Sequence, residues 1–243
     1  MHENWLTALV NQYLAGVANT VLGWFNLRAE NPEHPWESWL VMELVVAAIL
    51  VVLVAVVRSS LSADKPGKLQ HLFETLYGFL RNQAIDVGLE HPDKYINWLG
   101  TIFICILTMN LIGIIPIFES PTMYVYVPAA FAAMTWLYYH SMGIRELGVL
   151  KYLAKFGGPI LALAPVMFFI EIIGDVARML SLSVRLYGNM FAGEQITNVF
   201  IVLTYLIVPV LFMGLHVFVS FLQAYVFTLL TMIYLSLGTS HEH

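Results

Sequence analysis

The chain has 243 residues, of which 59% are hydrophobic and only 11% are charged, with a net charge of −5 at pH 7. A soluble domain carries about 25% charged residues, so this composition indicates a polytopic membrane protein. The start, Met-His-Glu-Asn-Trp, has no basic segment before an apolar core, which predicts no cleaved signal peptide. The single cysteine, Cys105, excludes an internal disulfide and a cysteine-built metal site, and no motif indicates nucleic-acid binding.

The N-terminal part, residues 1–38, is expected to be an extracytoplasmic amphipathic segment. Residues 4–25 place their apolar side chains on one helical stripe. This pattern predicts a helix that lies on the membrane surface or, equally, packs on its own protein. Residues 39–57 follow with a single charge, Glu43, and are long enough to cross about 30 Å of hydrocarbon. From there on, residues 39–243 are expected to form a single polytopic membrane domain.

The middle of the chain predicts two further membrane spans and one helix at the interface. Residues 69–87 have the apolar repeat of an amphipathic helix that lies in the interface. A second span is predicted over 98–117, and a third span ends near His140. Two tyrosines precede His140, which is therefore expected in the aromatic belt at the membrane surface. Residues 143–158 contain three basic side chains and are expected to form a loop.

The C-terminal part predicts a pair of long helices. No Asp, Glu, Lys or Arg occurs between Gln195 and Ser240, a run far longer than one membrane span needs. Pro209 is the predicted break between helices at 160–205 and 209–238. Both helices exceed one upright crossing, so residues 159–240 are expected to form a strongly tilted membrane hairpin. The predicted fold class is all-α, with three transmembrane helices, an interfacial amphipathic helix and this hairpin.

The basic residues predict the orientation. They gather in residues 58–94 and 143–158, whereas the opposite side holds only Arg28. Cytoplasmic loops carry an excess of Lys and Arg. The N-terminus is therefore expected outside and the C-terminus in the cytoplasm.

A charged stretch, residues 171–194, interrupts the apolar sequence. An arginine at the centre of a membrane helix costs about 2.5–3.5 kcal/mol on insertion scales, so it persists only with partners, water or a function. Helical spacing groups the polar residues into two stripes. The first contains Glu171, Asp175, Arg178, Ser181, Arg185 and Asn189, and the second contains His216, Ser220 and Gln223.

Two facing stripes of this kind are typical of a proton path, because carboxylates and imidazoles exchange protons while amides and hydroxyls order water. A guanidinium keeps its proton, and so it would hold a nearby carboxylate ionised or block proton passage. Glu171, Asp175 and Arg178 are also compatible with a salt-bridged helix end, and Arg178 with snorkelling to the cytoplasmic surface.

Two other classes of membrane protein share some of these features. A secondary transporter also uses broken helices and buried charges, but usually has repeated halves, and no repeat is found here. An intramembrane hydrolase needs a nucleophile or a metal set, for which Ser220 near His216 is only a weak dyad.

The segment Ser181-Leu-Ser-Val-Arg185-Leu-Tyr-Gly-Asn189-Met-Phe-Ala-Gly-Glu194 resembles the signature of subunit a of F-type ATP synthases, the membrane stator beside the c-ring. The resemblance extends to Asn110 with the turn Gly113-Ile-Ile-Pro116, and to His216 followed by Gln223. It covers most of the chain from residue 95 on.

The resemblance implies a proton channel in two halves, with no catalytic residue, metal or cofactor in this chain. Arg185 would separate the two halves and attract each deprotonated carboxylate of the c-ring. Protons would leave on the cytoplasmic side near Glu171, with Asp175 and Arg178 nearby. They would arrive from the outer side past Asn110, Asn189, Glu194, His216 and Gln223. Ser181 is also expected among the residues of proton translocation.

The resemblance also implies partners and a location, and it contains one departure. The partners are the c-ring, the b subunits of the peripheral stalk and membrane lipid, in a large hetero-oligomeric complex of the bacterial inner membrane. Some bacterial members carry acidic residues at the positions of Gly113 and Phe118, which are uncharged here. Glu119 is the candidate replacement at the channel mouth.

Overall fold

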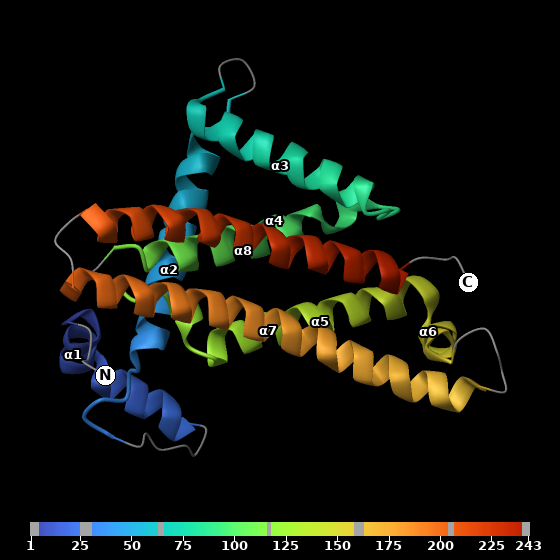
Figure 1. Cartoon of the computed structure of the whole chain (residues 1–243), viewed down its shortest axis with the longest axis horizontal. Helices are drawn as coiled ribbons and strands as arrows, with labels where there is room; N and C mark the ends of the chain where they lie inside the picture. Colours follow the sequence, from blue (N-terminus) through green and yellow to red (C-terminus); the bar gives the residue numbers. More distant parts are fainter. Residues whose placement is uncertain are drawn as a thin grey trace.

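The computed structural model describes residues 5–24, 31–62, 66–115, 118–157, 163–203 and 207–239 (Figure 1). Within these ranges the chain is helical and contains no strand, which confirms the all-α fold class. Its elements are α1 (Trp5–Trp24), α2 (Ser38–Ser59), α3 (Lys68–Asp86), α4 (Pro92–Ile112), the short 3-10 helix η1 (Pro121–Met123), α5 (Tyr126–Leu147), α6 (Val149–Phe156), α7 (Ala164–Leu203) and α8 (Ile207–Thr239).

Three of the described helices are long and apolar enough to cross a membrane: α2, α4 and the Val210–Thr239 part of α8. The first two correspond to the predicted spans 39–57 and 98–117. However, α4 begins earlier than predicted, with Pro92 in its first turn, and it ends at Ile112. The third predicted span falls in α5, which is not among these three, because polar and aromatic side chains interrupt its apolar sequence.

The loop predicted for residues 143–158 is wrong. Helix α5 continues to Leu147, and α6 follows directly after Gly148. The φ angle of Gly148 is 77°, a conformation that glycine adopts without strain, so the chain can reverse sharply between the two helices. The basic residues that mark a membrane surface are equally compatible with an exposed helix, and for this reason the pattern did not reveal α6.

Helices α7 and α8 are the two longest and run antiparallel, side by side (Figure 1). Phe200 of α7 stacks on Phe212 of α8 with ring centroids 4.5 Å apart. The two helices predicted over 160–205 and 209–238 are confirmed within a few residues, but Pro209 is not at the break, because α8 begins at Ile207 and Pro209 lies in its first turn. A proline is tolerated there, since the first backbone N–H groups of a helix have no partner within it. Residues 204–206 lie outside the described residues.

The core forms where α4, α5, α7 and α8 meet. Leu186 and Met190 of α7 are completely buried there, as are Ile106 of α4 and Phe227 of α8. Val184, in contrast, is 63% exposed. One face of α7 is therefore core and the opposite face is an uncovered apolar surface.

Helix α1 confirms the helix predicted for residues 4–25, and one of its sides packs on the protein, as the second alternative predicted. Its polar side packs on the protein: Asn11 accepts a hydrogen bond from the backbone N–H of Trp36 at 2.9 Å and donates one to its carbonyl at 3.1 Å. Its apolar side chains, including Trp5, Tyr13 and Trp24, are exposed. The position of α1 on a membrane surface stays a prediction.

Candidate functional site

Arg185 lies on the exposed face of α7. Ser181 and Asn189, one turn away on either side, are exposed with it, whereas the neighbouring Leu186 is buried. Among the residues that the structure describes, Arg185 makes no hydrogen bond and no ion pair. A guanidinium on an apolar helix face is costly in a membrane unless water or a counter-charge stabilises it.

A set of polar side chains connects α7 with α8, and it is named here the central polar cluster. The amide of Asn189 donates a hydrogen bond to Gln223 Oε1 at 2.8 Å. One turn further along α7, the His216 ring lies against Gly193, where an added Cβ would be 3.4 Å from Nδ1. The full cluster consists of Asn110, Ser120, Thr122, Asn189, Glu194, His216, Ser220 and Gln223.

The central polar cluster extends from α7 to α4 through the turn before η1. The Glu194 carboxylate accepts a hydrogen bond from the Ser120 backbone. The hydroxyls of Ser120 and Thr122 are 2.7 Å apart, and Thr122 donates to Asn110 Oδ1 at 2.7 Å. Ser120 Oγ also donates to the Met109 carbonyl at 2.9 Å. The hydroxyls of Ser120 and Thr122 have two protons for these three contacts. The hydrogen bonds can therefore exchange donors when a hydroxyl rotates.

Several buried atoms of the central polar cluster have no hydrogen-bond partner within the described part of the chain. A buried polar group left unsatisfied costs about 1–3 kcal/mol, and such groups are normally satisfied by ordered water. The atoms are Asn110 Nδ2, Glu194 Oε2, His216 Nε2, Ser220 Oγ and Gln223 Nε2. Three of them, on His216, Ser220 and Gln223, follow one another along α8, whereas Asn110 and Glu194 both contact the turn at Ser120 and Thr122. The central polar cluster is therefore suited to bind water. Because Ser220 Oγ is not bonded to His216, the hydrolase dyad is not formed.

Gly113 is required by the close approach of the turn that carries Ser120. A Cβ at Gly113 would lie 2.7 Å from Ser120 Cβ and 3.1 Å from its backbone nitrogen, so no acidic side chain fits there. Phe118 packs against the apolar cluster formed by α2 and α4. Glu119 accepts a hydrogen bond from the Tyr124 hydroxyl at 2.6 Å and acts electrostatically on Glu194. A carboxylate is therefore present beside the central polar cluster, although not at the positions of Gly113 or Phe118.

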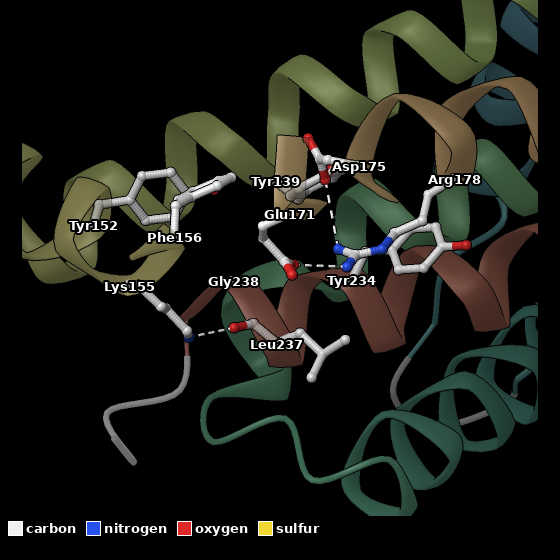
Figure 2. A pocket seen from close by; sticks show the side chains of 10 residues that line it. All are labelled: Tyr139, Tyr152, Lys155, Phe156, Glu171, Asp175, Arg178, Tyr234, Leu237 and Gly238. Carbon is white, nitrogen blue, oxygen red and sulfur yellow. Dashed lines mark hydrogen bonds and ion pairs between the residues drawn. The ribbon is translucent and has the colours of Figure 1, made fainter. Parts of the chain in front are cut away.

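A cavity of about 240 Å³ lies where α5, α6, α7 and α8 meet, at the other end of α7 (Figure 2). Arg178 reaches into it and donates to Glu171 at 2.8 Å, while its other terminal nitrogen is 3.5 Å from Asp175. The salt-bridged arrangement predicted as an alternative is thus confirmed. The lining residues are Tyr139, Tyr152, Lys155, Phe156, Glu171, Asp175, Arg178, Tyr234, Leu237 and Gly238.

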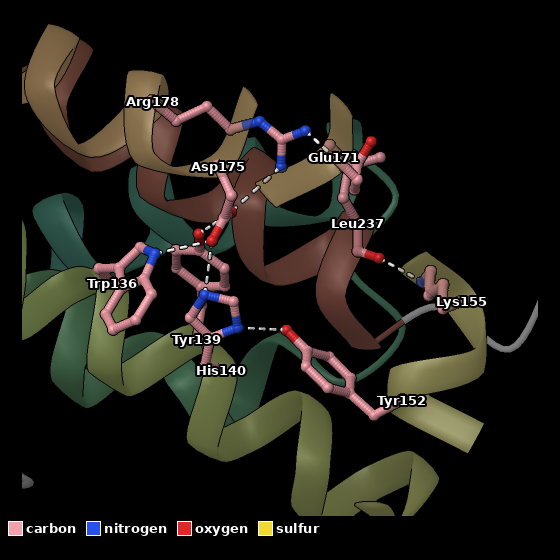
Figure 3. Close-up of polar contacts among 9 residues, drawn as sticks. All are labelled: Trp136, Tyr139, His140, Tyr152, Lys155, Glu171, Asp175, Arg178 and Leu237. Carbon is pink, nitrogen blue, oxygen red and sulfur yellow. Dashed lines mark hydrogen bonds and ion pairs between the residues drawn. The ribbon is translucent and has the colours of Figure 1, made fainter. Parts of the chain in front are cut away.

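The partners of Asp175 were not predicted from the sequence. The indole of Trp136 donates to Asp175 at 2.7 Å, the Tyr139 hydroxyl donates to it as well, and His140 Nε2 is 2.7 Å away (Figure 3). His140 is therefore mostly buried against α7, and its predicted place in an aromatic belt is wrong. The only sequence signal was general: a carboxylate in an apolar helix needs donors, whose identity depends on how α5 packs.

Comparison with known proteins agrees with the signature around Arg185. A family model described as ATP synthase A chain matches residues 40–236. ATP synthase subunit a of Solibacter usitatus (strain Ellin6076) is 50% identical over 235 residues, which cover 97% of this chain and 100% of the relative. ATP synthase subunit a of Koribacter versatilis (strain Ellin345) is 43% identical over 242 residues, which cover 100% of this chain and 99% of the relative. The chain therefore belongs to the family of ATP synthase subunit a, a family of membrane proteins.

Proposed function

We propose that the chain is the proton-translocating stator of the membrane sector of an F-type ATP synthase, and that it carries out no bond chemistry itself. The observation that carries this proposal is the set of buried polar atoms in the central polar cluster that have no hydrogen-bond partner among the described residues. Through the Asn189–Gln223 hydrogen bond this set reaches the turn of α7 next to Arg185. Water bound to these atoms would connect the outer side with the exposed face of α7. The c-ring would pack on that face and supply the missing counter-charge.

In this proposal the central polar cluster is the inlet half-channel. Glu119 attracts protons at its mouth, and Glu194 and His216 are the groups able to exchange them. Asn110, Ser120 and Thr122 order the water between α4 and α7. Asn189 and Gln223 deliver the proton to a c-ring carboxylate next to Ser181 and Arg185.

The outlet half-channel is the cavity beside Arg178, where Glu171 receives the proton released by the c-ring and Asp175 lies next to it. Arg185 keeps the two half-channels apart, because a permanently charged guanidinium repels a hydrated proton and holds an incoming carboxylate ionised. A charge that crosses the membrane is worth about 2.3 kcal/mol per 100 mV, which is lost if the two half-channels connect directly.

The proposed placement of the protein in the membrane follows from α2, whose apolar sequence suits an upright membrane span. Because α2 runs steeply across α7 and α8 (Figure 1), these two form a hairpin that tilts strongly in the membrane. The N-terminus, with α1 on the surface, is outside, and the C-terminus is in the cytoplasm. Residues 39–243 form one membrane domain in the bacterial inner membrane, and the remaining partners are the b subunits and lipid.

Arg185→Ala tests the proposal in inverted membrane vesicles that contain the whole complex. Without the guanidinium, c-ring carboxylates are no longer held ionised at the barrier, and ATP-driven proton pumping should be abolished. Val184→Ala, which shortens a neighbouring exposed side chain on the same face, is the matched control and should pump normally. Coupled pumping by Arg185→Ala at the control rate would refute the assignment.

Purification of the chain provides a second test. A stator subunit should co-isolate with a small carboxylate-bearing ring protein, whereas a transporter should take up substrate without a partner.

A further inference from the structure

Asp175 has its hydrogen-bonding needs met without Arg178. Its Oδ2 accepts from Trp136 Nε1 at 2.7 Å and lies 2.7 Å from His140 Nε2, and its Oδ1 accepts from the Tyr139 hydroxyl (Figure 3). All three partners belong to α5, and the Asp175 side chain is only 6% exposed. Asp175 is thus a buried anion enclosed by donors from a neighbouring helix.

Arg178, as a result, pairs with the other carboxylate. Hydrogen bonds between charged groups are about 2.7–2.9 Å long, which describes the 2.8 Å contact with Glu171 but not the 3.5 Å contact with Asp175. Glu171 is 45% exposed at the cavity and Asp175 is buried. A buried carboxylate loses more by giving up a partner than an exposed one. The guanidinium would therefore move to Asp175 if the donors from α5 were incomplete.

We propose that His140 is a positioning residue of the outlet, which satisfies Asp175 and thereby leaves Arg178 to pair with Glu171. The ring of His140 is oriented for this role, because its Nδ1 is 2.6 Å from the hydroxyl of Tyr152 on α6. The inference rests on the proposed function, in which Glu171 releases protons to the cytoplasm. The ionisable side chains that face this site are Tyr139 and His140 of α5, Tyr152 and Lys155 of α6, Glu171, Asp175 and Arg178 of α7, and Tyr234 of α8.

His140→Phe removes both ring nitrogens but keeps a flat ring of similar size. Asp175 then draws Arg178 away, and Glu171 loses the cation that favours its ionised form. The measurement is passive proton conduction through vesicles that hold the membrane sector without its catalytic sector, against pH on the cytoplasmic side. Conduction falls at acidic pH, where Glu171 keeps its proton. The pH range of this fall, called here the acid limb, should move to higher pH, because the Arg178 guanidinium no longer pairs with the Glu171 carboxylate.

Three further variants separate positioning from packing. His140→Gln places an amide donor near the position of Nε2 and should keep the wild-type limb. Asp175→Asn removes the competing anion, so whatever its effect on the amplitude of conduction, it should not move the acid limb to higher pH. The double variant His140→Phe, Asp175→Asn should return the limb to the wild-type pH, a rescue that a merely structural role of His140 does not predict.

The proposal is overturned if His140→Phe lowers the amplitude without moving the limb, or if the double variant fails to restore it. It is also overturned if Asp175→Asn alone removes the limb, since Asp175 would then be the carboxylate that exchanges protons. Infrared titration of the Glu171 carboxyl in the purified complex, identified by its loss in Glu171→Gln, separates this proposal from the proposed function. An infrared shift in His140→Phe without a conduction shift supports the pairing and refutes Glu171 as the outlet. No infrared shift refutes the pairing itself.

Discussion

The amide of Asn189 donates a hydrogen bond to Gln223 at 2.8 Å, and this contact joins an exposed residue to a buried one. Asn189 stands one turn from Arg185 on the open face of α7, whereas Gln223 is 4% exposed and belongs to the buried stripe of α8. The pair therefore connects the surface proposed for the c-ring with the interior polar path.

Gln223→Leu should lower proton conduction about fivefold, because a hydrogen bond is worth about 1 kcal/mol and an apolar side chain cannot replace it. Asn189→Leu should have a similar effect. If the two residues act through their shared bond, the double variant should be little worse than either single variant. Multiplicative losses in the double variant, measured in the same vesicles, would show that they act independently.

Glu194→Gln should lower proton conduction at least tenfold while the complex assembles normally. The amide can still accept the hydrogen bond from the Ser120 backbone, but it cannot carry a proton. His216→Phe, which keeps a flat ring beside Gly193, should also lower conduction. Co-purification with the c-ring is the control for assembly. A loss of conduction that merely follows loss of the subunit from the membrane would make the role of these residues structural.

Gly113→Ala, just after the end of α4, should destabilise the complex, whereas Gly100→Ala within α4 should not. The first methyl group would meet Ser120 at 2.7 Å, and overpacking of this kind typically costs about 1–3 kcal/mol. The second would meet only Leu80 Cδ1 at 3.9 Å, and alanine favours a helix over glycine by about 0.5–1 kcal/mol. Thermal stability of the detergent-solubilised complex measures both effects. Equal midpoints for the two variants would contradict the close approach at Gly113.

Asp93→Asn should loosen α3 from α4, because Arg81 Nε donates to Asp93 at 2.7 Å and links the two helices. The ion pair exists only while the Asp93 carboxylate is ionised, so protonation in acid removes it from the wild-type protein as well. Hydrogen exchange in α3 should therefore be faster in Asp93→Asn at neutral pH, and the difference from the wild type should disappear in acid as Asp93 takes up a proton. A difference that persists in acid would indicate a contact other than the ion pair.

The sequence predicts those parts of the molecule that depend on local order along one helix. Apolar runs of sufficient length located α2 and α4. Helical spacing placed Ser181, Arg185 and Asn189 on one face of α7, where the structure has all three exposed. These predictions succeed because the 3.6-residue period depends on the backbone of a single helix. The break near Pro209 was misplaced, because a proline at the start of a helix and a proline between two helices leave the same pattern.

The sequence did not predict the contacts between helices. The apolar stripe of α1 did not reveal that its polar side packs on Trp36, and the position of Gly113 did not reveal how near Ser120 lies. His140 is the clearest case: its neighbours in sequence are typical of a membrane surface, but its partner is Asp175, on another helix.

The sequence by itself determined that this is a helical membrane protein of the subunit a family and which polar residues line its two stripes, since composition, period and signature are local properties. Only the tertiary structure decided which carboxylate receives Arg178, which donors enclose Asp175, and that Glu194 meets the turn at Ser120 rather than a side chain at Gly113. Hydrogen bonds and ion pairs act over about 3–4 Å, so their partners depend on how whole helices pack, and the spacing of residues along one helix does not encode that arrangement.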